Sequence, residues 1–234
     1  EAEEKITVNG NVDLYAVVFN RTTETDLTED QLPQVDIYKY KQVIFVGDSR
    51  TEFMENVLTG MGESATKNVK FVCSAGKGLD WFTTTGWAQL YSIVQHDSNS
   101  ILSKKTAVIF NFGVNDLSKS ADYAEYYNWI APQLKSKGCE LYFMSVNPVN
   151  RLMLPNAGRA DRSEAAVRSF NQYMKANLSS AYTYIDMYSY LKSTGYSFAS
   201  DHYGTGTVDD GLHYTTRTYK RIFAKCMDSL RVPA

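Results

Sequence analysis

The chain has 234 residues, 44% of them hydrophobic and 21% charged, so it can bury a substantial core as one large domain or two small ones. Its formal net charge of −2 gives no electrostatic reason to expect nucleic acid or an anionic membrane as a partner. No apolar run approaches the roughly 20 residues of a membrane-spanning helix. Cys73, Cys139 and Cys226 are too widely spaced for a zinc site or a disulfide framework, and we expect buried thiols.

Residues 1–40 differ from the rest and carry no chemical signature. Residues 6–12 predict a hairpin with Asn9-Gly10 at its turn. We expect residues 1–40 to be an N-terminal extension or a linker remnant, and residues 41–234 to form the main domain. The missing start methionine and this extension favour a secreted or cell-surface protein, while the few cysteines fit the cytoplasm equally well.

From residue 43 onward, apolar runs alternate with segments of helical pattern. The predicted strands cover residues 43–46, 69–73, 107–112, 141–146 and 182–185. The predicted helices cover residues 52–58, 79–95, 123–137, 162–178 and 216–230, and a long loop follows Asp186. This alternation is typical of βαβ units, and it predicts an α/β fold: a three-layer α/β/α sandwich around a parallel, flavodoxin-like sheet of five strands.

The first strand leads into the turn Gly47-Asp48-Ser49, where a helix is expected to begin. A serine at the carboxyl end of a buried parallel strand, facing a helix N-terminus, is well placed for nucleophilic chemistry. The ordinary alternative is a capping box in which Ser49 and Glu52 satisfy the first free amides of the helix. We interpret Asp48 as a structural brace of the turn.

Three later loops also carry chemically useful groups: Gly76-Lys77-Gly78, Asn115 with Asp116, and the pair Asp210 and His213. Each could be an ordinary turn. The loops that leave the carboxyl ends of parallel strands meet at one rim of the sheet, however, and that rim is where ligands bind. A serine, an imidazole, a carboxylate and an amide brought together there supply one complete catalytic mechanism.

The base in such a mechanism must be one of only three histidines, His96, His202 and His213. His96 lies at a predicted helix end, which leaves His213 as the preferred candidate and His202 as a distant second. A spacing of three residues lets Asp210 and His213 approach each other within one turn of chain.

The four segments resemble, in this order, the motif blocks of the SGNH (GDSL-type) hydrolases: Gly47-Asp48-Ser49, Gly78, Gly113-Val114-Asn115-Asp116 and Asp210-Gly211-Leu212-His213. The resemblance spans residues 43 to about 230. It implies that Ser49 is the nucleophile, His213 its general base and Asp210 the group that orients His213. It also implies an oxyanion hole formed by the backbone amides of Ser49 and Gly78 and the side chain of Asn115. The sequence shows no cluster of metal ligands and no phosphate-binding glycine loop, so we expect no cofactor and no metal.

Two positions depart from the family pattern. Arg50 stands where the family name has leucine, and because a cation at a helix N-terminus is unfavourable, we expect Arg50 to pair with a nearby acid or to meet a substrate anion. Cys73 stands where the family usually has asparagine, five residues before its glycine. Gly76 therefore remains an alternative to Gly78 as an oxyanion donor.

The resemblance predicts a serine esterase that hydrolyses O-acyl esters, and we expect a small-molecule or glycan O-acetyl ester as its substrate. Aromatic, amide and cationic side chains suit sugar hydroxyls, and the predicted rim loops carry several: Trp81, Asn147, Asn150, Arg151, Arg159 and Tyr203, in addition to Arg50. Two alternatives stay open, namely an O-acetyltransferase with the same triad and a non-catalytic glycan-binding module.

Overall fold

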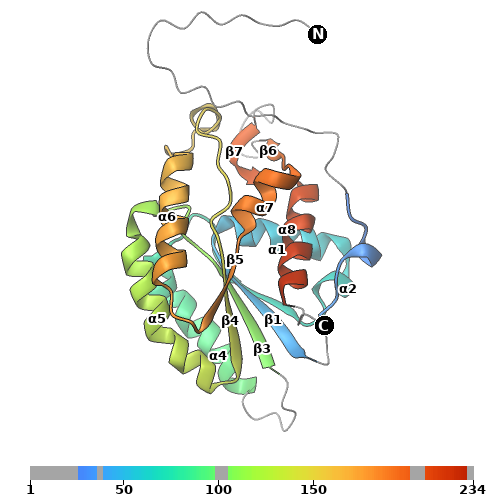
Figure 1. The fold of residues 1–234 in the computed structure, drawn as a ribbon. Helices are drawn as coiled ribbons and strands as arrows, with labels where there is room; N and C mark the ends of the chain where they lie inside the picture. Colours follow the sequence, from blue (N-terminus) through green and yellow to red (C-terminus); the bar gives the residue numbers. More distant parts are fainter. Residues whose placement is uncertain (1–25, 36–38, 98–104, 201–208, 231–234) are drawn as a thin grey trace, which may run out of the picture.

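The structure, a computed structural model, describes residues 26–35, 39–97, 105–200 and 209–230. Five strands form one parallel sheet: β1 (Tyr40–Gly47), β2 (Val69–Cys73), β3 (Lys105–Asn111), β4 (Cys139–Met144) and β5 (Tyr182–Ile185). Their order across the sheet is β2-β1-β3-β4-β5, which is the flavodoxin-like order (Figure 1). The predicted sheet is therefore confirmed, and all five strands lie where the apolar runs placed them.

Both faces of the sheet are buried, because successive side chains of a strand point to opposite faces. Ile44, Val46, Val108 and Phe110 face one hydrophobic cluster, while Val43, Phe45, Ala107 and Ile109 face a second. The first cluster is closed by α4 (Trp87–Asp97), α5 (Ser120–Ser136) and α6 (Glu164–Asn177). The second is closed by α1 (Ser49–Met61), α7 (Met187–Thr194) and α8 (Thr216–Ser229), so the domain has three layers (Figure 1).

Shorter elements complete the described chain. Two are short α-helices, α2 (Glu63–Thr66) and α3 (Leu79–Trp81), and a π-helical turn, Phe82–Gly86, joins α3 to α4. The sequence predicted one helix over residues 79–95, weakened at Gly86. A Cβ at Gly86 would lie 2.7 Å from the ring of Trp81, so the glycine lets the backbone pass close to that ring where the helix widens. Three 3₁₀ turns, Glu29–Gln31, Leu117–Lys119 and Pro155–Ala157, lie in connecting segments.

The predicted long loop after Asp186 is wrong in two respects. Asp186 caps α7, accepting a hydrogen bond from the Ser189 amide at 3.0 Å. β6 (Phe198–Ser200) then pairs with β7 (Asp209–Tyr214) in a separate antiparallel sheet of two strands. Sequence patterns missed this sheet because a three-residue strand is too short to show an alternating pattern. The consequence matters for function, because β7 carries Asp210 and His213.

The expected hairpin at residues 6–12 lies outside the described residues, and the domain boundary at residue 40 stays a prediction. Of the preceding segment, residues 26–35 are described, and Leu32 and Val35 are buried in the hydrophobic cluster on the α1 and α8 face. All three cysteines are free thiols; Cys139 and Cys226 are buried as expected, whereas Cys73 is only partly buried. None of the helices in the described ranges combines the length and the hydropathy that crossing a bilayer would require.

Candidate active site

Ser49 is the first residue of α1, directly after the turn that ends β1. Gly47 allows this turn to form close to β3, since a Cβ there would lie 2.8 Å from the Asn111 carbonyl oxygen. Asp48, and not Ser49, is the N-cap of the helix, because its Oδ1 accepts a hydrogen bond from the Arg50 amide at 3.0 Å. Ser49 is therefore not the residue that caps the helix, and Asp48 has the structural role that was expected for it. Burial raises the pKa of Asp48 to about 6.

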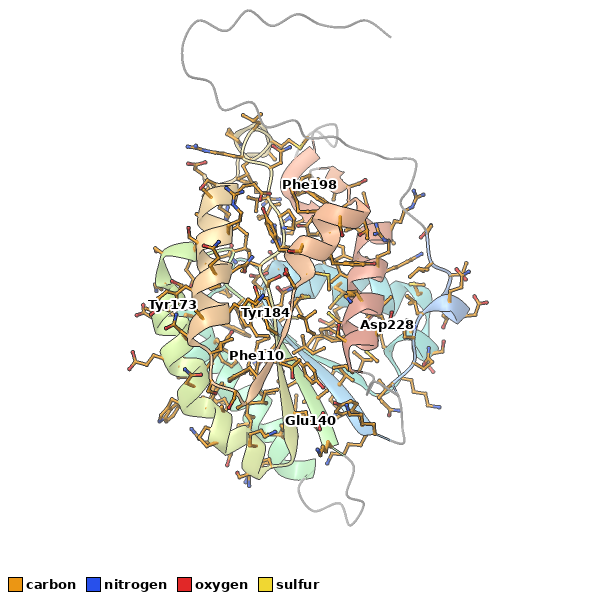
Figure 2. The ribbon with its side chains drawn as sticks, viewed as in Figure 1. Phe110, Glu140, Tyr173, Tyr184, Phe198 and Asp228 are labelled. Atoms are coloured by element: carbon orange, nitrogen blue, oxygen red, sulfur yellow. The ribbon has the colours of Figure 1, made fainter. Side chains whose placement is uncertain are left out.

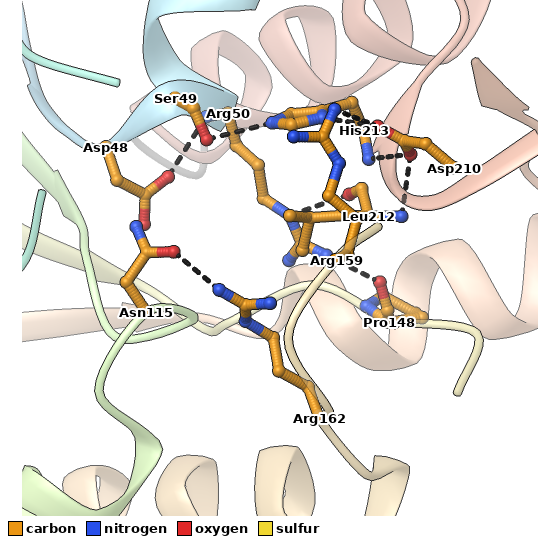
Figure 3. Close-up of polar contacts among 10 residues, drawn as sticks. All are labelled: Asp48, Ser49, Arg50, Asn115, Pro148, Arg159, Arg162, Asp210, Leu212 and His213. Carbon is orange, nitrogen blue, oxygen red and sulfur yellow. Dashed lines mark hydrogen bonds and ion pairs between the residues drawn. The ribbon is translucent and has the colours of Figure 1, made fainter. Parts of the chain in front are cut away.

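His213 and Asp210 reach Ser49 from β7 (Figure 3). His213 Nε2 lies 2.9 Å from Ser49 Oγ, and His213 Nδ1 lies 2.5 Å from Asp210 Oδ2. The second carboxylate oxygen, Oδ1, accepts hydrogen bonds from the amides of Leu212 at 2.8 Å and His213 at 2.7 Å. Both oxygens of Asp210 therefore form hydrogen bonds, and the carboxylate contacts the imidazole at Nδ1.

The pKa values of the pair suit a neutral base beside a charged carboxylate. Burial lowers the pKa of His213; Asp210 opposes this, but the charges of Arg50 and Arg159 add to the lowering, and the net pKa lies below its usual value. Burial alone would raise the pKa of Asp210, yet its bonds to His213 and to backbone amides bring the net pKa below normal. Near neutral pH the imidazole is therefore uncharged and can accept a proton from Ser49.

Asn115 lies across the site from His213, and its side chain is fixed in one orientation (Figure 3). Arg162 Nη2 donates to Asn115 Oδ1 at 2.9 Å, and Asn115 Nδ2 donates to the Lys77 carbonyl oxygen at 2.8 Å. A carboxamide nitrogen carries two hydrogens, so one of them remains for a further acceptor. Arg162 also donates to the carbonyl oxygens of Val114 at 2.6 Å and Ala160 at 2.9 Å, which ties it to the backbone beside Asn115.

Gly78 is held against the residue that follows Asn115. Asp116 Oδ2 accepts a hydrogen bond from the Leu79 amide at 2.9 Å, while its Oδ1 accepts one from the Tyr123 hydroxyl at 2.7 Å. A Cβ at Gly78 would lie only 2.3 Å from Asp116 Oδ2, so this contact requires glycine. Gly76, by contrast, has no atom within 4 Å of where a Cβ would be. Packing therefore ties Gly78, rather than Gly76, to the Asn115 segment, although both remain candidates for the oxyanion donor.

The expectation for Arg50 is wrong. Its side chain is only 2% exposed, and its guanidinium donates to three backbone carbonyl oxygens: Leu212 at 3.0 Å, Asn147 at 2.9 Å and Pro148 at 2.9 Å. These acceptors satisfy the buried cation without an acid partner or a substrate anion. The sequence missed this arrangement because it depends on three carbonyl groups from two distant segments.

Three other residues that were expected to contact the substrate are buried or bind other groups of the chain. Asn147 is 1% exposed and cannot reach a ligand at the surface. Arg151 is exposed, but it forms an ion pair with Asp161, with Nε and Oδ1 2.8 Å apart. Asn150 Oδ1 accepts a hydrogen bond from the Leu152 amide at 3.0 Å, which makes it a turn residue.

Trp81 and Arg159 remain available near the rim. Trp81 is half-buried against the ring of Phe112. The side chain of Arg159 is 23% exposed, and its Nη2 lies 3.4 Å from Asp210 Oδ2, so Arg159 reaches the triad directly. Tyr203 and His202 lie outside the described residues.

Arg162 is the charged group whose role at the site the sequence did not reveal. It lies at the start of a predicted helix, and no motif distinguishes it from other arginines. Among the described residues, no group of three or more His, Cys, Asp or Glu side chains is arranged to hold a metal ion.

A parallel α/β sheet whose carboxyl rim brings a serine within hydrogen-bond reach of a histidine paired with an aspartate is an arrangement that α/β serine hydrolases use. The sequence model of the GDSL-like lipase/acylhydrolase family matches residues 43–226, and the chain belongs to this family. The resemblance inferred from the motif blocks is therefore confirmed.

Solved structures share the fold. A candidate SGNH hydrolase from Slackia heliotrinireducens aligns with a TM-score of 0.54 at 12% identity, covering 82% of this chain and 100% of its own. A candidate acylhydrolase from Bacteroides fragilis gives 0.55 at 16% identity, covering 86% and 92%. An acetyl xylan esterase, AlAXEase, gives 0.51 at 11% identity, covering 81% and 100%. A search of curated protein sequences found no match.

Proposed function

We propose that this family member is a serine esterase that forms an acyl-enzyme on Ser49. The observation that carries the proposal is the continuous chain of hydrogen bonds from Asp210 through His213 to Ser49 Oγ, with distances of 2.5 and 2.9 Å. The three groups come from two elements, and Ser49 and His213 are 164 residues apart in sequence. A serine paired to a base that is itself oriented by a carboxylate is the general arrangement of an activated nucleophile.

In the proposed mechanism, each proton transfer involves a named atom. Asp210 accepts the hydrogen bond from His213 Nδ1–H, which leaves the electron pair of Nε2 directed at the Ser49 hydroxyl. As Ser49 Oγ attacks the ester carbonyl, its proton passes to Nε2, and the imidazolium then returns that proton to the departing alcohol. Water repeats the sequence on the acyl-enzyme, and it releases the acid and restores the Ser49 hydroxyl.

The oxyanion of each tetrahedral intermediate would be stabilised by amide donors at the same rim. The Ser49 amide lies at the N-terminus of α1, where the first helical N–H groups have no intrahelical acceptor. The second hydrogen on Asn115 Nδ2 and the Gly78 amide complete the proposed set, and Arg162 and Asp116 hold these two donors in place. Donors that are fixed in advance need no reorganisation as charge develops.

For the substrate, we propose an O-acetyl ester on a carbohydrate. The likeness in fold to an acetyl xylan esterase supports this choice. Trp81 and Arg159 are the predicted contacts that keep some exposure near the rim, and an aromatic face and a guanidinium both suit sugar hydroxyls. A secreted or cell-surface location, which we propose with it, would place the enzyme beside such glycans.

The proposal is tested with p-nitrophenyl esters of increasing acyl length, with acetylated glycans, and with a fluorophosphonate probe. We expect turnover that is fastest on acetate, and covalent labelling that is lost in Ser49→Ala. Ser74→Ala, which removes another serine hydroxyl on the loop after β2, is the matched control and should label normally. Labelling that persists in Ser49→Ala would identify a different nucleophile. A wild-type protein without any turnover would favour a glycan-binding module, and transfer of acetyl to an added glycan would indicate a transferase.

A further inference from the structure

Arg50 occupies an unusual position for a buried cation, because it directly follows the proposed nucleophile. Its three hydrogen bonds, of 2.9 to 3.0 Å, end on backbone carbonyls of residues 147, 148 and 212. The first two lie just after β4, and the third lies on β7 next to His213. One side chain therefore connects the beginning of α1 with two segments that are about 97 and 162 residues away in sequence.

The guanidinium contacts the residues on both sides of His213. Arg50 Nε donates to the Leu212 carbonyl oxygen, and the guanidinium carbon lies 5.3 Å from the ring centroid of Tyr214 (Figure 3 shows the contact with Leu212). The Tyr214 hydroxyl donates to the Pro148 carbonyl oxygen at 2.5 Å, and Arg50 Nη2 donates to the same oxygen. The backbone that carries the imidazole is thus fixed to the residue that follows Ser49.

We infer that Arg50 is a positioning residue that sets the distance between Ser49 Oγ and His213 Nε2. The inference rests on the proposed function and deepens it. A leucine at this place could fill the volume, but it has no donors for the three carbonyls. Arginine is suited to the task, because its planar group presents five N–H donors in fixed directions. Lysine presents a single, strongly hydrated ammonium and cannot reproduce that arrangement.

The charge of Arg50 adds a second effect on the base. The charged groups that act on His213 are Asp210 from β7, Arg159 from the segment between β4 and α6, and Arg50 from α1. Asp210 raises the pKa of His213, and both arginines lower it, so removing either positive charge should raise the pKa. A residue that served only the stability of the fold would have no such effect on the pH profile.

The test compares Arg50→Met and Arg50→Lys with a matched control, Arg221→Met. Arg221 is also a buried arginine that binds backbone carbonyls, with Nη1 3.0 Å from the Gly195 oxygen, but its bonds go to the end of α7 and not to His213. For each variant the measurements are kcat and KM on p-nitrophenyl acetate, the pH profile of kcat/KM, and Tm.

For Arg50→Met we expect kcat to fall by about 100-fold, since a displacement of about 1 Å between reacting groups has this effect. The acidic limb of its pH profile should move to higher pH. Arg50→Lys retains the charge, so its acidic limb should stay close to that of the wild type while kcat still falls; it also serves if the methionine variant does not fold. Arg221→Met should lower Tm and leave kcat and the limb unchanged.

The inference would be overturned if the Arg50 variants kept wild-type kcat, or if Arg50→Met and Arg221→Met lost activity equally with the same pH profile. The second result would mean that Arg50 acts through stability alone. These outcomes differ from a failure of the proposed function, which would appear as a wild-type protein that neither hydrolyses esters nor reacts with a fluorophosphonate, and which would overturn this inference as well.

Discussion

The two ends of the central sheet both carry clusters of polar side chains, but only one of them is the proposed active site. At the amino end of the strands, Glu140 accepts hydrogen bonds from the hydroxyl of Tyr40, from Tyr142 at 3.3 Å and from Lys105 Nζ at 2.6 Å. Figure 2 labels Glu140 at this end and, at the opposite end of the molecule, Phe198, which pairs with Tyr214 of β7. At the carboxyl end, Asp210, His213 and Ser49 form the hydrogen-bonded chain of the proposed triad.

The two clusters differ in whether they contain a base that can still accept a proton. Lys105 neutralises Glu140, and hydrogen bonds from Lys105 and Tyr40 outweigh the effect of burial, so the pKa of Glu140 falls to about 2. Burial and the same carboxylate raise the pKa of Tyr40, which keeps its proton. His213, in contrast, presents an uncharged nitrogen to a hydroxyl. A cluster is reactive when a base of suitable pKa remains able to take a proton, and the number of polar groups does not decide it.

The largest expected effect concerns the orientation of that base. Asp210→Asn replaces the carboxylate that accepts from His213 Nδ1–H with a carboxamide that can donate to it, which favours the wrong imidazole tautomer. We expect kcat on p-nitrophenyl acetate to fall by roughly 10⁴-fold, as in other triads, with little change in KM. Asp161→Asn, on the neighbouring exposed loop, is the control. A loss below tenfold would show that Asp210 does not orient the base.

A smaller loss is expected across the site. Asn115→Ala removes the proposed side-chain donor to the oxyanion, and one such donor is worth about 100- to 1,000-fold in turnover. The loss should appear in kcat with KM nearly unchanged, because the oxyanion exists only in the transition state and the intermediate. Asn128→Ala, which removes an exposed amide on α5, should retain full turnover. A near-normal rate in Asn115→Ala would remove this residue from the mechanism.

The pH dependence of kcat/KM gives a third test of the cluster at the carboxyl end. The proposed mechanism requires a neutral His213. We therefore expect kcat/KM to fall about tenfold per pH unit below the pKa of His213, which lies below its usual value of about 6.5. Arg159→Gln removes a positive charge near the imidazole and a contact of Asp210, and both changes favour the imidazolium. The acidic limb should therefore move to higher pH. Arg151→Gln, on the same loop but paired with Asp161, should leave the limb in place.

The sheet could be predicted from short-range patterns, and the roles of Ser49, His213 and Asp210 were implied by the resemblance to a known family. Apolar runs of four to eight residues mark buried strands, and side chains that follow such strands share one rim by the topology of a parallel sheet. The burial of Arg50 depends instead on the carbonyl groups of residues 147, 148 and 212, which only the folded chain brings close to it. The separate sheet of β6 and β7 depends on the pairing of a strand of only three residues. No local pattern encodes contacts of this kind.

The smallest expected effect tests the amino end. Glu140→Gln keeps the shape of the side chain but removes the charge that binds Lys105 and Tyr40. We expect the free energy of unfolding to fall by about 1–3 kcal/mol, the range for hydrogen bonds to a charged group, with kcat unchanged. Denaturant unfolding followed by circular dichroism measures the first quantity and p-nitrophenyl acetate turnover the second.

The pH dependence of that loss has a definite sign. The pKa of Glu140 is lower in the folded protein than in the unfolded chain, so its contribution is present above about pH 4.3 and is lost as the pH falls towards about 2. The wild type and Glu140→Gln should therefore differ in stability at neutral pH and converge in acid. A stability difference that persisted at pH 2 would show that the charge of Glu140 is not what stabilises the fold. A loss of turnover at pH 7 would show that the cluster at the amino end contributes to activity, and the two ends of the sheet would then not differ in function.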